Sequence, residues 1–440
     1  REAGADTTST ARGEAGSGTS TGPLDLPELI DLGLRESPST RAAWEASRGA
    51  AARVGRSLEP YYPTLRTSAR LAPNERLLFQ DTPQTLIAHQ RAWEPQVSLA
   101  YTLLDFGRRA RTAEVARQRL TAANFSFNRE LQRVAFEVSH AYFLLDAAIA
   151  LEQAATENVE LARRVREAAT RRLDVGLGTR PDVLLAEQVE TRALYDRESA
   201  AAGIRAAEAQ LGRALGREAS RVPRVRPLNS QPIPTSLGAD VEALLARAVE
   251  QRPDLAARQA EVRAANADVE RARAEYMPTI GFAGNYGFDS WNYSLGSTND
   301  IRTNQPTWST AFRVDWDVFR GFGRANAVRE AKAASAQAQA ALERERIDAT
   351  AEVWTAYYDF QAARRKLEYA ETLLASAKEA YEGTAKSYEN GLADIVALLT
   401  AERDLAIARA TRVRARAELL TSAARLGYTV GLVVPEAEAR

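Results

Sequence analysis

The stretch FRVDWDVF, residues 312–319, alternates apolar and charged side chains along its whole length. Successive side chains of an extended chain point to opposite faces, so this alternation predicts a strand with one apolar and one charged face. The apolar face carries Phe312, Val314, Trp316 and Val318, and the charged face carries Arg313, Asp315 and Asp317. The apolar face must be shielded from water, either by a protein core or by lipid. The rest of the chain indicates which of the two it is.

Three other segments alternate in the same way and are predicted strands: 64–71, 96–104 and 279–288. With 310–319 they make two pairs of strands, each of a length that suits a membrane barrel, about 9–11 residues. Their apolar faces carry Leu65, Val97, Leu99, Tyr101, Ile280 and Phe282, and the opposite faces include Arg66 and Arg70. The linkers 72–93 and 289–307 are long and polar, so we expect them to be loops.

Composition excludes several classes of protein. The 440 residues include 58 basic and 58 acidic side chains, and a chain without basic excess is not expected to bind nucleic acid. There is no cysteine, which removes disulfides, thiolate metal sites and a cysteine nucleophile. The two histidines, His89 and His140, lack metal-ligand spacing, so no metal or other cofactor is expected. We also find no run of about 18 apolar residues, and therefore expect no transmembrane helix.

The chain is predicted to be a tandem duplication. Pro38 and Pro63 correspond to Pro253 and Pro278, and SHAYFLLDAA at 139–148 corresponds to WTAYYDFQAA at 354–363, all at one offset of 215 residues. Arg1 rather than Met opens the chain, which a removed signal peptide or trimming would explain. The expected divisions are a disordered tail at 1–22, repeats at 23–221 and 239–431, a linker at 222–238 and a tail at 432–440.

Each repeat contains a very long helical region with a heptad pattern. Small or apolar residues recur every seven positions, as in Val134, Ala141 and Ala148, which is coiled-coil spacing. Glycine-containing turns interrupt both regions, so each is predicted to be a helical hairpin, at about 108–215 and 323–426. The expected fold is thus mainly α, with a small β part at one end of two long hairpins.

The strands fit a transmembrane β-barrel, with lipid on the apolar face and water on the polar face. Four strands cannot close a barrel, because about eight is the usual minimum, and open edges are not tolerated in lipid. The barrel must therefore be shared between chains. The alternative is a soluble sheet packed on helices, and with it a soluble periplasmic coiled-coil scaffold or adaptor without a pore.

With these features, the sequence resembles the TolC family of outer-membrane efflux and secretion channels, over about Leu24 to Gly431. The resemblance rests on the duplicated element order, the strand-to-helix junctions LLDFGRRA (103–110) and FRGFGRAN (319–326), and the two hairpin turns. It implies a homotrimer whose chains share a 12-stranded barrel in the outer membrane of a Gram-negative bacterium and a helical tunnel in the periplasm. Such a channel is a passive duct and not an enzyme. A periplasmic adaptor docks on its tips, and an inner-membrane transporter supplies energy.

The resemblance also assigns the hairpin tips. Adaptor docking is expected at Val175, Gly176, Leu177, Asn390, Gly391 and Leu392. The family closes this end with a latch, in which Asp182 and Tyr388 occupy latch positions. The latch arginine is Ala393 here, so Arg180 is the expected substitute. The family's acidic constriction falls on Ala397 and Thr400, and Asp394, one turn away, is the candidate for an acidic ring.

Two motifs are set aside. Asp105-Phe106-Gly107 imitates a kinase metal-binding triplet, but the partner motifs of a kinase are missing. The segment GFAGNYG (281–287) lacks phosphate-loop spacing, and its glycines are better explained on the inner face of a barrel.

Overall fold

The structure is a computed structural model and describes residues 22–79, 86–228, 240–295 and 299–432. Most of the expected tails at 1–22 and 432–440 and of the linker at 222–238 lie outside these residues. The first repeat consists of α1 (Leu26–Glu36), α2 (Pro38–Ser57), β1 (Thr64–Phe79), β2 (Leu86–Leu104), α3 (Arg108–Asp174) and α4 (Arg180–Leu215). The second consists of α5 (Val241–Gln251), α6 (Pro253–Ala274), β3 (Thr279–Leu295), β4 (Asn299–Asp315), α7 (Gly323–Glu389) and α8 (Ile395–Val430).

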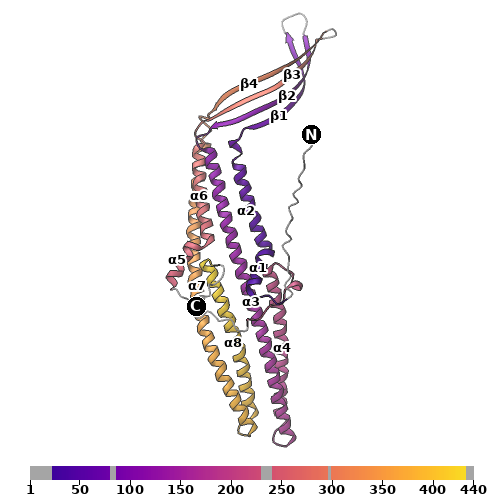
Figure 1. Cartoon of the computed structure of the whole chain (residues 1–440), viewed down its shortest axis with the longest axis vertical. Helices are drawn as coiled ribbons and strands as arrows, with labels where there is room; N and C mark the ends of the chain where they lie inside the picture. The colour runs from indigo at the N-terminus through magenta and orange to yellow at the C-terminus, as the bar shows by residue number, and fades with distance from the viewer. Residues whose placement is uncertain (1–21, 80–85, 229–239, 296–298, 433–440) are drawn as a thin grey trace, which may run out of the picture.

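The two repeats have the same element order and almost the same lengths, which confirms the duplication. Both α3 and α7 contain 67 residues, and both α4 and α8 contain 36. At about 1.5 Å per residue, α3 and α7 are each about 100 Å long. Figure 1 shows the resulting rod, with the sheet at one end and the two hairpin turns at the other. The helices α2 and α6 run beside the half near the sheet, and α4 and α8 beside the half near the turns.

The heptad rows bury the seams between these helices, as expected. In the first repeat Val134, Val138 and Leu145 of α3 pack in one cluster with Leu211 and Leu215 of α4. A matching cluster in the second repeat joins α7 to α8 and α5, and contains Val353, Ala356, Phe360, Ala363, Leu419 and Leu426. Alanine at many seam positions lets helix backbones approach closely.

We expected no transmembrane helix, but one helix, α3, is long and apolar enough in its composition to cross a membrane. One 18-residue window within α3 has a mean hydropathy of 1.5, which is apolar enough by length and composition to cross a membrane. In the structure 44% of that window is buried. A core helix passes the same test, and part of α3 packs against α1 and α4 in the core of the first repeat.

Ionic contacts tie the two repeats together at mid-length. Arg129 Nε of α3 lies 3.1 Å from Asp254 Oδ2 of α6, and its guanidinium lies 3.8 Å from the ring centre of Tyr428 in α8. Arg252, only 2% exposed, pairs with Asp254 at 2.7 Å and with Glu352 of α7 at 2.8 Å. Arg129, Arg252 and Asp254 are largely shielded from water, so each depends on its partner for stabilisation, whereas Glu352 is 48% exposed.

The four strands form one antiparallel sheet in the order β1-β2-β3-β4. The strands contain 16, 19, 17 and 17 residues, so they are much longer than predicted. Most described residues of the linkers 72–93 and 289–307, which we expected to be loops, continue the strands. The strands pass through Pro73 and Pro306, which lie on the edge strands β1 and β4, where proline is tolerated.

The fourth strand ends earlier than predicted. β4 stops at Asp315, so Trp316, Asp317 and Val318 lie beyond it and do not continue its alternation. Side-chain contacts hold this end in a different path. Trp316 Nε1 donates to the Tyr276 carbonyl at 3.1 Å, and Asp317 Oδ2 lies 3.6 Å from Arg324 Nη2 of α7. The prediction that Asp317 lies on the charged face of the strand is therefore wrong, and so is the prediction that Trp316 and Val318 lie on its apolar face. All three residues lie in the junction between the sheet and the helices.

Candidate functional site

One face of the sheet is apolar across all four strands. The strand register places Leu65 opposite Leu99, Leu99 opposite Gly284, and Phe282 opposite both Tyr101 and Phe312. The rings of Phe282 and Phe312 are 5.4 Å apart. Much of this face is uncovered: Leu65 is 70% exposed and Phe312 is 76% exposed. The structure thus brings together, on one face, the predicted residues Leu65, Val97, Leu99, Tyr101, Ile280, Phe282, Phe312 and Val314.

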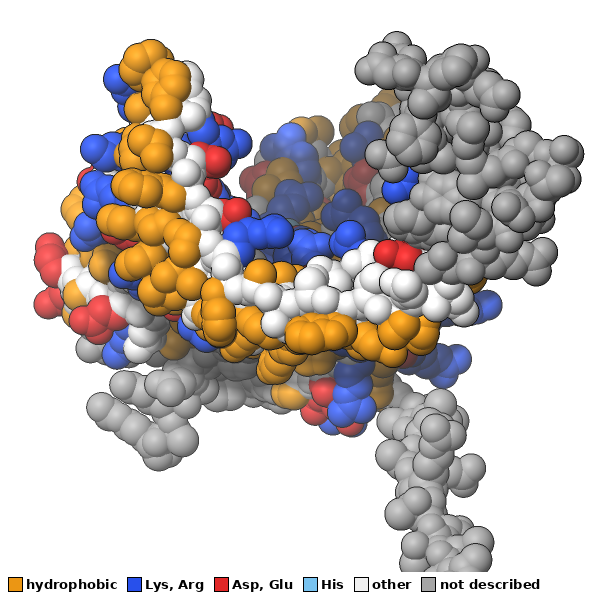
Figure 2. All heavy atoms as spheres, turned by 90° about the horizontal axis from the view of Figure 1, so that it is seen from above, with side chains coloured by type: hydrophobic (Ala, Val, Ile, Leu, Met, Phe, Trp, Pro, Cys, Tyr) orange, Lys and Arg blue, Asp and Glu red, His pale blue; other side chains and the backbone are white. Residues whose placement is uncertain are grey.

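The other face carries small, polar and charged residues. Arg66 lies opposite Ser98, Arg70 opposite Glu94, and Arg313 opposite Gly281. Figure 2 looks down on this end and shows hydrophobic side chains along the outer, convex side of the sheet, with small and polar residues on the inner side. Of the glycines in 281–287, Gly281 and Gly287 lie on this face as expected, and a Cβ atom on Gly287 would lie only 2.7 Å from the Pro95 carbonyl oxygen, but Gly284 lies opposite Leu99 on the apolar face. The predicted residues Arg66, Arg70, Arg313 and Asp315 share this face.

An unusual backbone turn joins each strand pair to its long helix. Phe106 and Phe322 have positive φ angles of 52° and 65°, and they are the described non-glycine residues in the left-handed region. Large side chains rarely adopt this conformation because Cβ crowds the backbone. Both phenylalanines are exposed, at 46% and 74%. Each repeat thus places a left-handed phenylalanine at the junction of sheet and helix, next to Gly107 in the first repeat and to Gly321 in the second.

Arg109 is a residue that the sequence analysis missed, and it pins the first junction. Its Nη1 donates to the carbonyls of Thr102 at 2.7 Å and Pro60 at 3.1 Å, and its Nε donates to Asp105 Oδ2 at 3.0 Å. Its guanidinium also lies 4.8 Å from the ring centre of Tyr61. One largely shielded cation thus connects the end of β2, the start of α3 and the segment before β1.

Arg324 occupies the corresponding place in the second repeat. It pairs with Asp317 and lies 5.9 Å from the ring centre of Tyr276, as Arg109 does with Tyr61. The duplicated junction sequences, LLDFGRRA and FRGFGRAN, both place an arginine close after the junction glycine. Arg109 stands two positions after Gly107, and Arg324 stands one position after Gly323. A side-by-side comparison of the repeats at these junctions would have found them.

At the opposite end, both hairpin turns have the same geometry. Gly176 and Gly391 each have φ of 76°, which glycine adopts without steric cost. The N–H of Leu177 donates to the Arg172 carbonyl, and the N–H of Leu392 donates to the Ser387 carbonyl, both at 2.8 Å. These bonds close the helix ends as Schellman motifs. The turns leave apolar side chains in water: Val175, Leu177 and Leu392 are 68%, 70% and 83% exposed.

The two hairpins pack together just above these turns. Tyr388 of α7 is 6% exposed and belongs to an apolar cluster with Val165, Ala169, Val183, Ala186, Ile395 and Leu398. Arg172 of α3 reaches across: its Nη1 donates to the Tyr388 carbonyl at 2.7 Å, and its guanidinium lies 4.8 Å from the Tyr388 ring centre. Burial raises the pKa of Tyr388. The cross-hairpin contact thus comes from Arg172, which the sequence analysis did not single out.

The other latch candidates have different local roles. Asp182 Oδ2 accepts from the Thr179 N–H at 2.8 Å, in the capping box that starts α4. Arg180 is exposed and, within the described chain, makes no hydrogen bond or ion pair, so Arg172 rather than Arg180 contacts Tyr388. Asp394 is the N-cap of α8 and accepts from the Ala397 N–H at 2.7 Å. It lines a shallow hollow together with Ala397, Thr400 and Asp404.

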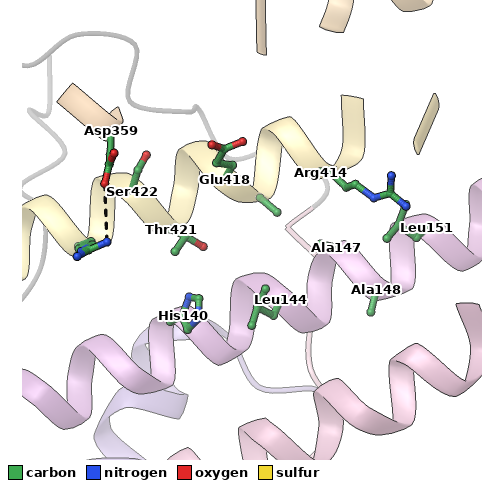
Figure 3. Close-up of a pocket in the computed structure, with 12 residues that line it drawn as sticks. His140, Leu144, Ala147, Ala148, Leu151, Asp359, Arg414, Glu418, Thr421 and Ser422 are labelled. Atoms are coloured by element: carbon green, nitrogen blue, oxygen red, sulfur yellow. Dashed lines mark ion pairs between the residues drawn. The ribbon is translucent and has the colours of Figure 1, made fainter. Parts of the chain in front are cut away.

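A second hollow lies between α3 and α8 nearer the middle of the rod, and Figure 3 shows it. His140 and Leu144 of α3 face Glu418, Thr421 and Ser422 of α8 across it. The Ser422 hydroxyl donates to the Leu419 carbonyl at 2.9 Å, so it is committed to its own helix. Burial lowers the pKa of His140. This hollow therefore does not assemble a serine nucleophile with a histidine base.

Comparisons with known proteins agree with this geometry. The family model described as outer membrane efflux protein matches residues 29–217 and 244–432, one match per repeat. Protein CyaE of Bordetella pertussis is 32% identical over 417 residues, which is 93% of this chain and 84% of that protein. Alkaline protease secretion protein AprF of Pseudomonas aeruginosa is 27% identical over 63% of this chain and 59% of that protein.

Solved structures show the same fold. The outer-membrane channel OprN superposes with a TM-score of 0.78 at 23% identity, over 92% of this chain and 89% of that one. The open state of the Neisseria gonorrhoeae MtrE outer membrane channel gives a TM-score of 0.74 at 22% identity, over 92% and 89%. From the two family matches and the identity to CyaE, the chain belongs to the outer membrane efflux protein family, whose members lie in the outer membrane and extend into the periplasm.

Proposed function

We propose that three copies of this chain form the passive exit duct of a tripartite efflux pump or type I secretion system. The observation that carries the proposal is the sheet: four strands with one apolar face, one polar face and unpaired edges at β1 and β4. Such edges are not tolerated in lipid, so the sheet must close with other copies. Three copies supply 12 strands, enough for a barrel with an aqueous interior.

The polar face then lines the water-filled interior, and the apolar face meets lipid. Arg66, Arg70, Arg313 and Asp315 are the lumen-facing residues of this arrangement. The observed strands are longer than the 9–11 residues that cross a membrane, so their far ends extend beyond the lipid. This explains why alternation is weaker there, because both faces of a strand outside the membrane meet water.

The helices support the same arrangement. Beside its buried seam, α7 carries a second row of large exposed side chains, with Ile347, Trp354, Tyr358 and Tyr369 exposed by 60%, 48%, 49% and 68%. A row of this kind on an otherwise soluble helix indicates an interface, and a neighbouring copy in the helical tunnel would cover it. A tunnel about 100 Å long would carry the duct across the periplasm.

The hairpin turns supply the docking and gating ends. Val175, Leu177 and Leu392 offer exposed apolar contacts to a periplasmic adaptor, and Gly176, Asn390 and Gly391 shape the turns that present them. The contact of Arg172 with Tyr388 holds the two hairpins together in the closed tip. Energy comes from an inner-membrane transporter bound through the adaptor. The name of AprF, a protease secretion protein, favours secretion of a protein substrate for this chain as well.

The first test is the protein mass of the particle in detergent, with bound detergent subtracted, followed by conductance in a planar bilayer. About three times 48.1 kDa together with stable conducting units would support the duct. A monomer or dimer that is stable without detergent would instead support the alternative, a soluble periplasmic scaffold or adaptor without a pore.

A further inference from the structure

One acidic side chain lies inside the packed interface of the hairpins near the tip. Glu402 of α8 continues the buried row of Ile395, Leu398 and Leu405, and is only 4% exposed. Its Oε2 atom is buried and has no hydrogen-bond partner. Because a single chain already buries it, neighbouring copies are not needed to exclude water from this carboxyl. A buried charge without a partner is strongly unfavourable, so this position favours the neutral acid.

The groups around Glu402 do not neutralise it. Tyr381 of α7 is close enough for the Glu402 charge to act on its hydroxyl, and Arg164 of α3, Arg409 of α8 and Glu389 of α7 act on the same tyrosine. Arg409 is committed elsewhere, since its Nη1 donates to Asn158 Oδ1 at 2.7 Å and its Nη2 lies 3.4 Å from Glu157 Oε2. Within the described chain, no hydrogen bond or ion pair joins Glu402 to either arginine.

Burial is also the cause that raises the pKa of Glu402 from its ordinary 4.5 to about 7. The packed tip therefore holds a proton that a water-exposed Glu402 would release at a lower pH. Below pH 4.5 both arrangements are protonated, and pH has no effect on their balance. Between pH 4.5 and 7 only the exposed form loses its proton, so rising pH favours separation of the helices.

We propose that Glu402 is a proton-dependent lock on the closed tip: the neutral carboxyl stays in the interface of α3, α7 and α8, and the ionised carboxylate favours an arrangement in which α8 moves toward water. This inference rests on the proposed duct, since it assigns the lock to the gating end. Acidification keeps the tip packed, and pH near neutrality loosens it without any change in the adaptor.

The expected magnitude follows from the pKa difference. For one carboxyl, the ratio of loosened to packed tips rises about tenfold per pH unit between pH 4.5 and 7, or roughly 300-fold in total. Hydrogen exchange of the whole assembled protein in detergent measures this ratio, once it is corrected for the intrinsic pH dependence of exchange. The peptides to follow cover 395–409 of α8 and 159–172 of α3.

The decisive variant is Glu402→Gln, which mimics the protonated acid. We expect the wild type to lose protection as pH rises from 5 to 7, and Glu402→Gln to stay protected throughout. The matched control is Glu382→Gln, the same change at an exposed position of α7 near Tyr381, and it should behave like the wild type. It also shows that the loss of one negative charge near the tip is not the cause.

Retention of the wild-type pH dependence in Glu402→Gln would overturn the lock and would point to another group, such as His140. If the variant does not assemble, the wild type alone decides, because constant protection from pH 5 to 7 also overturns the lock. The exchange measurement needs no conductance. A protein that fails to conduct in bilayers therefore counts against the duct, while a flat exchange profile counts against the lock.

Discussion

Phe312→Arg tests which face of the sheet meets lipid. Phe312 lies on the apolar face, is 76% exposed, and its ring is 5.4 Å from that of Phe282. An arginine on the lipid face of a barrel costs about 2–4 kcal/mol near the middle of the membrane and less near its edges. Loss of the aromatic pair adds about 0.5–1.5 kcal/mol. We therefore expect a destabilisation of about 2.5–5.5 kcal/mol per chain if Phe312 lies near the middle of the membrane.

Ala311→Arg is the matched control, because it introduces the same residue at the adjacent position of the same strand. Ala311 lies opposite Ala283 on the other face, where an arginine would join Arg313 in the proposed water-filled interior. We expect a cost below about 1 kcal/mol, within the range of surface substitutions. The assay is denaturant unfolding of the protein in lipid vesicles, monitored by tryptophan fluorescence. Equal costs at the two positions, or a larger cost for Ala311→Arg, would refute the assignment of the faces.

Three further substitutions test the junction and the tip. Arg109→Ala should destabilise the sheet-to-helix junction by about 3–5 kcal/mol, because it leaves the 5%-exposed Asp105 without its cation, and thermal melting of the protein in detergent would reveal it. Arg172→Ala removes a hydrogen bond and a cation–π contact worth roughly 1–3 kcal/mol together, so bilayer conductance should rise; Arg180→Ala should not change it. Asp394→Ala should lower cation selectivity, and an unchanged reversal potential in a salt gradient would remove Asp394 from the constriction.

Much of the fold could be predicted because it depends on local periodicity. The heptad rows through Val134 and Ala141 bury one side of α3 whatever lies beside it, and the turn glycines Gly176 and Gly391 mark the ends of the long helices. The repeat then doubles every such feature. For the same reason, the apolar and polar faces of the sheet follow directly from the alternation within each strand.

The tertiary structure alone decided the features that depend on contacts between distant segments. Strand length depends on pairing: β1 and β4 continue through prolines because each proline lies on an edge that needs no donor within the chain. β4 ends at Asp315, and the residues that follow contact distant segments: Trp316 bonds to the Tyr276 carbonyl and Asp317 pairs with Arg324.

The contacts between the two hairpins near the tip also depend on the tertiary structure and not on any local sequence pattern. Arg172 and Arg180 stand close to the same turn in sequence, and no local pattern says that only Arg172 reaches the other hairpin. Glu402 is a further example, since a glutamate on a charged helix is normally solvated. Sequence periodicity determined which face of each helix is buried. The packing of α8 against α3 and α7 decided that one position of that face holds an unpaired carboxyl. The reason is that the burial of a side chain depends on all three helices together.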